Sequence, residues 1–126
     1  MAVIGVDLGG TKVSAALFSD KGKLITKEYR LLEGATGSAV GVLIAEMIVS
    51  LRSQRPDMPV EAVGICVPGI VYSKRETVWA PNIPGWDNYP LINDLQAVLG
   101  DRSIRIHIAS DRTCYILGEV WKGAAQ

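Results

Sequence analysis

The chain has 126 residues, of which 48% are hydrophobic and 21% are charged. This length suits one domain with a hydrophobic core and is too short for two, and the composition is typical of globular proteins. Thirteen basic residues balance thirteen acidic ones, so the charge offers no electrostatic footprint for nucleic acid. No apolar run is long enough to cross a bilayer, and the start lacks a signal core. We therefore expect neither nucleic acid nor a membrane as a partner.

The two cysteines, Cys66 and Cys114, stand far apart in the sequence. They form neither the Cys-x-x-Cys pair of a zinc site nor a disulfide framework. The cysteine pattern therefore favours a reducing, cytoplasmic setting.

The most informative stretch is residues 2–18, in which two apolar runs flank a glycine pair. The runs predict two buried strands, and Gly9 and Gly10 can adopt the positive φ that we expect their tight turn to require. The amides of both glycines and of Thr11 would then form a concave nest for an anion. Asp7 would lie beside that anion, where a carboxylate is useful if a metal ion lies between them. The hairpin predicts a site for nucleotide phosphates with magnesium; the alternative is an ordinary hairpin whose end Asp7 solvates.

Two better-known phosphate loops do not fit this stretch. Lys12 follows Thr11 directly, which breaks the spacing of the P-loop, and a strand pattern follows where the P-loop and the dinucleotide fingerprint both open a helix.

The next segments predict a third strand, a helix and a fourth strand. Residues 24–32 alternate and are more polar, which is typical of a strand near the sheet edge. Residues 38–53 follow a helical period, and residues 60–67 form an apolar run that would lie parallel to the first strand after a crossover. The apolar stripe of the helix consists of Val40, Leu43, Ile44, Met47, Ile48 and Leu51.

Residues 70–79 predict a small excursion, and residues 80–90 combine prolines, a glycine and aromatic residues. This composition indicates a rigid loop. Such a loop can line a sugar site, because an aromatic face packs on a pyranose while an amide reads its hydroxyls. The composition itself favours the simpler interpretation, a loop pinned by Trp86 and Tyr89.

The last third predicts a helix over residues 91–99, a strand over 105–109 and a helix over 112–121. The first helix would bury one side, ending at Gly100; that side consists of Leu91, Leu95, Val98 and Leu99. His107, the only histidine, is expected to be structural and is given no role.

Ser110 is a candidate N-cap of the last helix, and Asp111 would be stabilised in its first turn by the helix dipole. Asp111 either serves only that purpose or stands at the carboxyl end of a strand, where open α/β sheets bind ligands. Cys114 is expected in the core.

This order of elements is that of a ribonuclease H-like domain, one half of the architecture shared by actin, hexokinase and the heat-shock kinases. We therefore expect an α/β fold with a five-stranded mixed sheet and helices on both faces.

Four motifs resemble those of the ROK family of sugar kinases and bacterial repressors, in the order and positions of that family. Residues 7–12 are similar to its first phosphate motif, residues 64–69 to its Gly-x-x-x-Pro-Gly turn, and residues 80–86 to its Pro-Asn-Leu-x-x-Trp segment. Residues 110–111 with residues 118–119 resemble its Asn-Asp-x-Asn stretch and the following Gly-Glu. The motifs span nearly the whole chain, with glucokinases as the nearest resemblance.

The resemblance implies a role for each matching residue. Asp111 would be the general base that takes a proton from the sugar hydroxyl attacking the γ-phosphate. Asp7 would face magnesium through water. The phosphates of ATP would be met by Asp7, Gly9, Gly10, Thr11 and Lys12, and the sugar by Gly69, Asn82, Ser110 and Asp111.

Three positions depart from the family pattern. Ser110 replaces the asparagine before the catalytic aspartate, Thr113 replaces the second asparagine, and Arg112 replaces the small residue between them. This altered stretch favours an alternative function, a sugar-sensing domain of the repressor branch. A metal-dependent nuclease using Asp7 and Asp111 would suit the fold but lacks a basic surface.

The second half of the family, with its Glu-x-Gly-His sugar motif, its zinc motif and its adenosine pocket, does not occur before Gln126. Residues 1–126 therefore resemble a single N-terminal lobe of an ATP- and Mg²⁺-dependent hexose kinase, without the C-terminal lobe. Its partners would be a hexose and that missing lobe, or a second copy forming a homodimer. Alone, the lobe is expected to be almost inactive, because alignment of donor and acceptor needs both walls of the cleft.

Overall fold

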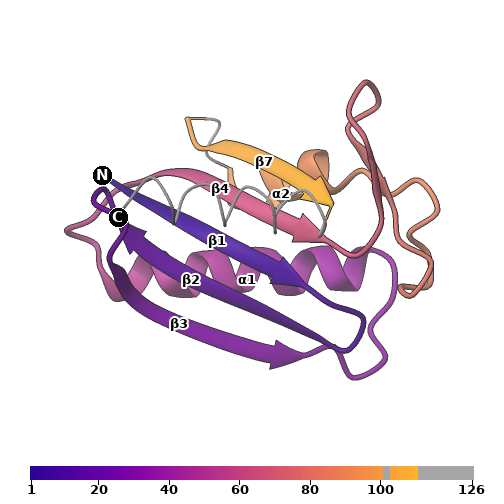
Figure 1. Ribbon diagram of the computed structural model, residues 1–126, viewed down its shortest axis with the longest axis horizontal. Helices are drawn as coiled ribbons and strands as arrows, with labels where there is room; N and C mark the ends of the chain where they lie inside the picture. The colour runs from indigo at the N-terminus through magenta and orange to yellow at the C-terminus, as the bar shows by residue number, and fades with distance from the viewer. Residues whose placement is uncertain (101–102, 111–126) are drawn as a thin grey trace.

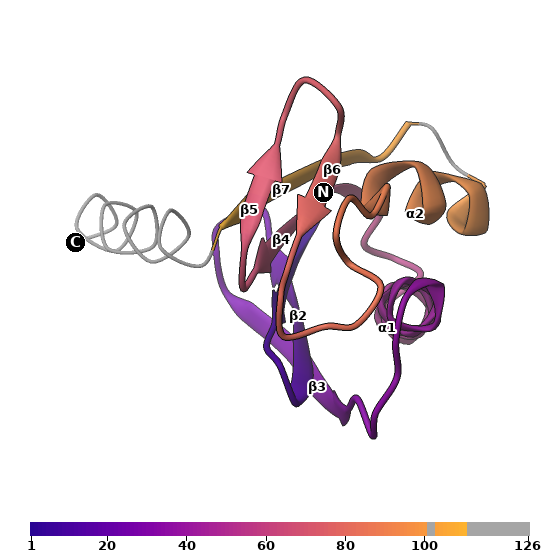
Figure 2. The same cartoon turned by 90° about the vertical axis from the view of Figure 1, so that its right-hand side faces the viewer.

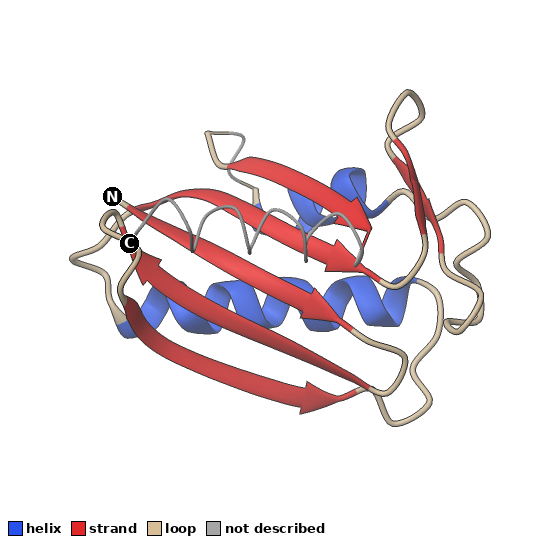
Figure 3. Ribbon diagram, in the orientation of Figure 1, coloured by secondary structure: helices blue, strands red, loops and turns tan. Residues whose placement is uncertain are grey.

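The computed structural model describes residues 1–100 and 103–110 and is built on a five-stranded sheet of order β3-β2-β1-β4-β7 (Figures 1 and 3). β1 (Ala2–Leu8) is antiparallel to β2 (Lys12–Ser19), which is antiparallel to β3 (Leu24–Leu31). On its other side β1 is parallel to β4 (Val60–Val67), and β4 is parallel to β7 (Arg105–Ser110). The predicted mixed sheet is confirmed.

Helices α1 (Ser38–Gln54) and α2 (Leu91–Leu99) lie together against one face of this sheet (Figure 2). In chain order α1 lies between the parallel strands β3 and β4, and α2 lies between the parallel strands β4 and β7. Both crossovers therefore bring their helix to the same side. The helix expected over residues 112–121 lies outside the described residues.

Burial explains why these two segments are helical. The stripe predicted along α1 is confirmed, since all its members are buried except Leu43, which packs at the margin of the core. In α2 the expected stripe holds for Leu91 and Leu95 but is wrong for Val98, whose side chain is 52% exposed. Burial is therefore concentrated near the start of α2, and the helix ends at Gly100 in a left-handed cap whose amide donates to the Gln96 carbonyl.

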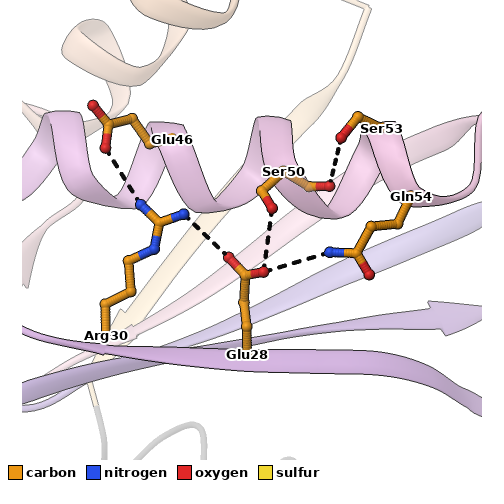
Figure 4. A network of polar contacts seen from close by, with 6 residues as sticks. All are labelled: Glu28, Arg30, Glu46, Ser50, Ser53 and Gln54. Carbon is orange, nitrogen blue, oxygen red and sulfur yellow. Dashed lines mark hydrogen bonds and ion pairs between the residues drawn. The ribbon is translucent and has the colours of Figure 1, made fainter.

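A polar network joins α1 to the edge strand β3 (Figure 4). Glu28 accepts hydrogen bonds from Ser50 Oγ at 3.2 Å and Gln54 Nε2 at 3.5 Å. Arg30 reaches Glu28 at 3.6 Å and Glu46 at 3.3 Å. β3 thus contacts the helix through ionic and hydrogen-bonding groups, which agrees with its predicted place at the sheet edge.

The excursion after β4 is a hairpin of β5 (Ile70–Tyr72) and β6 (Thr77–Trp79), followed by the loop of residues 80–90. Trp86 in this loop is fully buried, donates from Nε1 to the Gly37 carbonyl at 2.9 Å, and stacks on Tyr89 at 4.4 Å between ring centroids. The interpretation of a loop pinned by its own aromatic residues is confirmed.

The opposite sheet face carries small side chains along much of β1 and β4. Because side chains alternate along a strand, the face turned away from α1 presents Gly5 and Asp7 from β1, and Gly64 and Cys66 from β4.

Within the described ranges, neither helix has the length and apolar character needed to span a membrane.

Candidate functional site

The carboxyl ends of β1, β4 and β7 meet at one edge of the sheet, because these three strands are parallel (Figure 1). Asp7 pairs in register with Cys66, and Cys66 with Ala109. Two strand spacings therefore separate Asp7 from Ala109, or roughly 10 Å. Ser110 ends β7 at this edge; Asp111, the expected general base, lies outside the described residues.

The turn after β1 differs from its expected geometry. The Gly9 amide donates to the Lys12 carbonyl at 2.9 Å, so it closes the turn and is not open to an anion. Neither Gly9 nor Gly10 has positive φ, because a turn of this length does not need the left-handed conformation that a two-residue hairpin imposes. The expected nest therefore reduces to the amides of Gly10 and Thr11, for which no hydrogen-bond acceptor is recorded among the described residues.

The glycine turn and the loop of residues 80–90 lie against each other. A Cβ placed on Gly10 would lie 3.6 Å from the Asn82 Cβ, and Asn82 is exposed while its neighbour Ile83 is buried. The candidate phosphate and sugar segments, more than seventy residues apart in sequence, are adjacent in the fold.

Gly69 has a packing role. A Cβ at this position would lie 1.9 Å from the Trp79 carbonyl oxygen and 2.9 Å from the Ala80 Cα. The absence of a side chain thus lets β6 and the start of the loop cross directly over the end of β4. Contact between Gly69 and a sugar stays a prediction.

A cavity of about 670 Å³ opens on the sheet face that carries Asp7. Lys12, Ser14 and Tyr29 line it together with Asp7 and Cys66. The Lys12 ammonium lies 5.7 Å from the centre of the Tyr29 ring, within cation–π range. Gly69 and Asn82 lie outside this cavity.

Tyr29 was not among the residues predicted to lie near Asp7, although the alternation of side chains along the strands places it there. With the antiparallel register, Ser14 pairs with Tyr29 and Asp7 pairs with Ser14, which places Tyr29 in the same row as Asp7.

The Asp7 carboxylate and the amides of Gly10 and Thr11 suit a magnesium ion that binds together with a phosphate group. Among the described residues no three His, Cys, Asp or Glu side chains gather around a metal position, and Asp7 is exposed with no recorded ion-pair partner in those ranges. Mg²⁺ is commonly held by one or two carboxylates, water and phosphate oxygens rather than by an all-protein cage. Asp7 beside two open amides fits that pattern.

Cys66 corrects the expectation drawn from cysteine spacing. The structure records it as disulfide-bonded, and no described cysteine is free. Sequence distance gave no sign of this, because pairing depends on the fold.

His107 lies on β7 with an exposed side chain.

Known proteins of similar sequence show which family shares these motifs and this fold. The model of the ROK family matches residues 3–126. A glucokinase of Thermotoga maritima is 35% identical over all of this chain, which covers 38% of that protein. An N-acetyl-D-glucosamine kinase of Escherichia coli O139:H28 is 33% identical over 93% of this chain and 37% of its own length. The chain thus spans less than two fifths of these relatives.

Solved structures of similar proteins have the same fold as this chain. The ROK hexokinase of Thermus thermophilus superposes with a TM-score of 0.76 at 30% identity, covering 88% of this chain and 35% of that one. A ROK family glucokinase of Streptomyces griseus, solved with glucose and AMPPNP, gives 0.74 at 29% identity, covering 88% and 33%. These likenesses confirm the ribonuclease H-like half of the actin-like ATPase fold. The chain belongs to the ROK family.

Proposed function

We propose that this chain is the N-terminal lobe of an ATP-dependent hexose kinase, which transfers the γ-phosphate of ATP to a sugar hydroxyl. The observation that carries the proposal is the adjacency of Gly10 and Asn82 beside the edge where Asp7 and the end of β7 meet. The glycine turn after β1 suits phosphate, and the loop of residues 80–90 suits a sugar. Both belong to a chain whose relatives are named glucokinase and N-acetyl-D-glucosamine kinase.

The chain's own residues would act by alignment and charge. Bound Mg²⁺ would neutralise the charge that builds on the phosphates. The amides of Gly10 and Thr11 would donate to phosphate oxygens, and Asp7 would hold the hydrated metal. Asp111 would accept the proton of the attacking hydroxyl, a contribution of ~10²–10⁴-fold in rate. Gly69, Asn82 and Ser110 would position the sugar.

The remaining parts of the proposal concern the whole protein. A second lobe, or a second copy of this chain, would close the cleft, since phosphoryl transfer depends on positioning. The reaction would take place in the cytoplasm. The alternative, a sugar sensor, rests on the altered residues Ser110, Arg112 and Thr113. A ROK transcriptional regulator matches at 18% identity, which shows shared fold alone, so we favour the kinase.

The test is an ADP-release assay on the protein encoded by the complete reading frame that contains these residues. Glucose, N-acetylglucosamine and further hexoses are supplied one at a time with Mg-ATP. We expect sugar-dependent ADP release with one of them, and formation of the sugar phosphate by mass spectrometry. Tight sugar binding without turnover on any hexose would instead identify a sensor and reject the kinase.

A further inference from the structure

We propose that Ile70 and Trp79 form an apolar platform on which the acceptor sugar packs its C–H face, an inference that rests on the proposed function. The two residues pair in register across the β5–β6 hairpin, and directly opposed side chains project from the same face of a hairpin. Ile70 is 49% exposed and Trp79 is 37% exposed. The hairpin therefore presents an aliphatic and an aromatic surface side by side, which we call the Ile70–Trp79 platform.

Trp79 is the aromatic residue of this region whose ring is open to a ligand. The hairpin and the loop after it contain three other aromatic side chains. Trp86 and Tyr89 are buried and stack on each other. The Tyr72 ring is covered by the Arg75 guanidinium, which lies 4.3 Å from the ring centre. The Trp79 ring makes no aromatic or cation–π contact with any other described residue, so its face is available for packing.

The alternation along β6 turns the Trp79 ring away from the core. Val78, the preceding residue, is fully buried, and successive side chains of a strand point to opposite faces. Just beyond β6 the Ile83 amide donates to the Ala80 carbonyl at 3.0 Å, which closes a four-residue turn containing Asn82. Because the ends of such a turn lie within about 7 Å of each other, the exposed Asn82 stays close to the platform.

The platform lies at the carboxyl edge of the main sheet, beside the candidate site. Figures 1 and 2 show the β5–β6 hairpin at this edge, where β5 contacts β7. Gly69 directly precedes Ile70, and Asn82 lies against Gly10. The platform is therefore continuous with the segments predicted to contact the sugar and the phosphates.

The chemistry of this surface matches a pyranose, which has C–H groups on its faces and hydroxyl groups around its rim. Small-molecule sites are lined mainly by apolar and aromatic side chains, with a few polar groups that fix orientation. The platform would cover a C–H face, and the Asn82 amide would bond to hydroxyl groups. Since the platform carries no charge, acid or base, it contributes to binding of the sugar and not to the chemical step.

The test compares wild type with Trp79→Ala in the protein from the complete reading frame. Calorimetry gives the Kd of each hexose used in the ADP-release assay, and kinetics give kcat and the KM values of sugar and ATP. We expect Trp79→Ala to raise the Kd and the KM of the sugar about tenfold or more. The kcat and the KM of ATP should stay as in wild type, because the platform contributes equally to the ground state and the transition state.

Three further variants separate packing on the sugar from a structural effect. Trp79→Phe keeps an aromatic face and should recover most of the lost affinity. Ile70→Ala removes less surface and should weaken sugar binding by a smaller factor. Val98→Ala, which removes an equally exposed apolar side chain from α2, is the matched control and should bind sugar as wild type does. Thermal unfolding shows that each variant is folded.

An unchanged sugar Kd in folded Trp79→Ala and Ile70→Ala would overturn the proposal. So would an equal loss of affinity in Val98→Ala, or no binding of any of these sugars to wild type. A change in the mass measured by sedimentation, with the sugar Kd unchanged, would assign the platform to a contact between protein chains and would also overturn it. Sugar binding that depends on Trp79 without any ADP release would support the platform and reject only the kinase, so the two failures are distinguishable.

Discussion

Gly69 shows most directly how one residue supports the site. We predict that Gly69→Ala lowers the free energy of unfolding by about 1–3 kcal/mol or more. The new Cβ would meet a backbone carbonyl oxygen at 1.9 Å, which cannot rotate away. The matched control is Gly64→Ala, whose Cβ would meet none of the described residues within 4 Å and which should change stability by less than about 0.5 kcal/mol. Urea unfolding measures both, and equal midpoints would contradict the packing described for Gly69.

Tyr89 supplies a pH-dependent prediction. Its hydroxyl donates to Asp94 at 2.6 Å, and burial, with a smaller effect from that hydrogen bond, raises the pKa of Tyr89 above its usual value. The neutral phenol therefore contributes stability that is complete below about pH 10, the ordinary tyrosine value, and is lost as pH rises above it.

Tyr89→Phe should cost about 1–2 kcal/mol at pH 7, because it removes a hydrogen bond to a carboxylate. The difference between wild type and variant should then shrink between pH 10 and pH 11. Denaturant unfolding at several pH values measures this; a constant difference across that range would show that Tyr89 does not titrate as described.

The position of a single residue could be predicted where the local sequence determines it, and not where contacts between distant segments do. The places of Asp7 and Asn82 near this edge of the sheet were predictable because local motifs determine them. The Gly9 amide, Tyr29 and the bonded state of Cys66 were missed or misassigned, because turn closure and cross-strand register decide them. Such relations join positions that are distant in sequence.

At the scale of elements, the contact of α1 with β3 depends on charge. We predict that Arg30→Ala destabilises the chain by about 1–3 kcal/mol, since Glu28 Oε1 is buried with no hydrogen-bond partner among the described residues and lies 3.6 Å from Arg30 Nη2. Glu46→Ala removes the other partner of Arg30, but the Glu46 side chain is 58% exposed, so the cost should be at most about 0.5 kcal/mol. Thermal and urea unfolding of the two variants compare them. Equal losses would mean that Glu28 does not depend on Arg30.

The elements themselves were largely predictable. The period of α1 and the apolar runs of β1 and β4 matched the structure because burial imposes those patterns. The exposure of Val98 was not predictable, because a helical stripe shows which residues share a face but not how far the neighbouring element extends. The pinning of residues 80–90 was foreseen in kind, although its anchor at Gly37 required the fold.

At the scale of the whole molecule, the proposed function makes this chain one wall of a cleft. We predict that the 126-residue chain releases ADP from Mg-ATP with any hexose at no more than about 1% of the rate of the protein from the complete reading frame, because effective alignment contributes several powers of ten. The coupled assay measures both at equal molar concentration, with circular dichroism confirming that the shorter chain is folded. Comparable turnover by the two would show that one lobe suffices.

The proposed kinase activity depends on Asp111 acting as the base in a cleft shared with Asp7. The most direct measurement compares wild type with Asp111→Asn in the protein from the complete reading frame, by kcat for sugar phosphorylation and by calorimetric Kd for the sugar. We predict a fall in kcat of about 10²–10⁴-fold with the sugar Kd changed by less than about tenfold. An unchanged kcat in the folded variant would contradict the account.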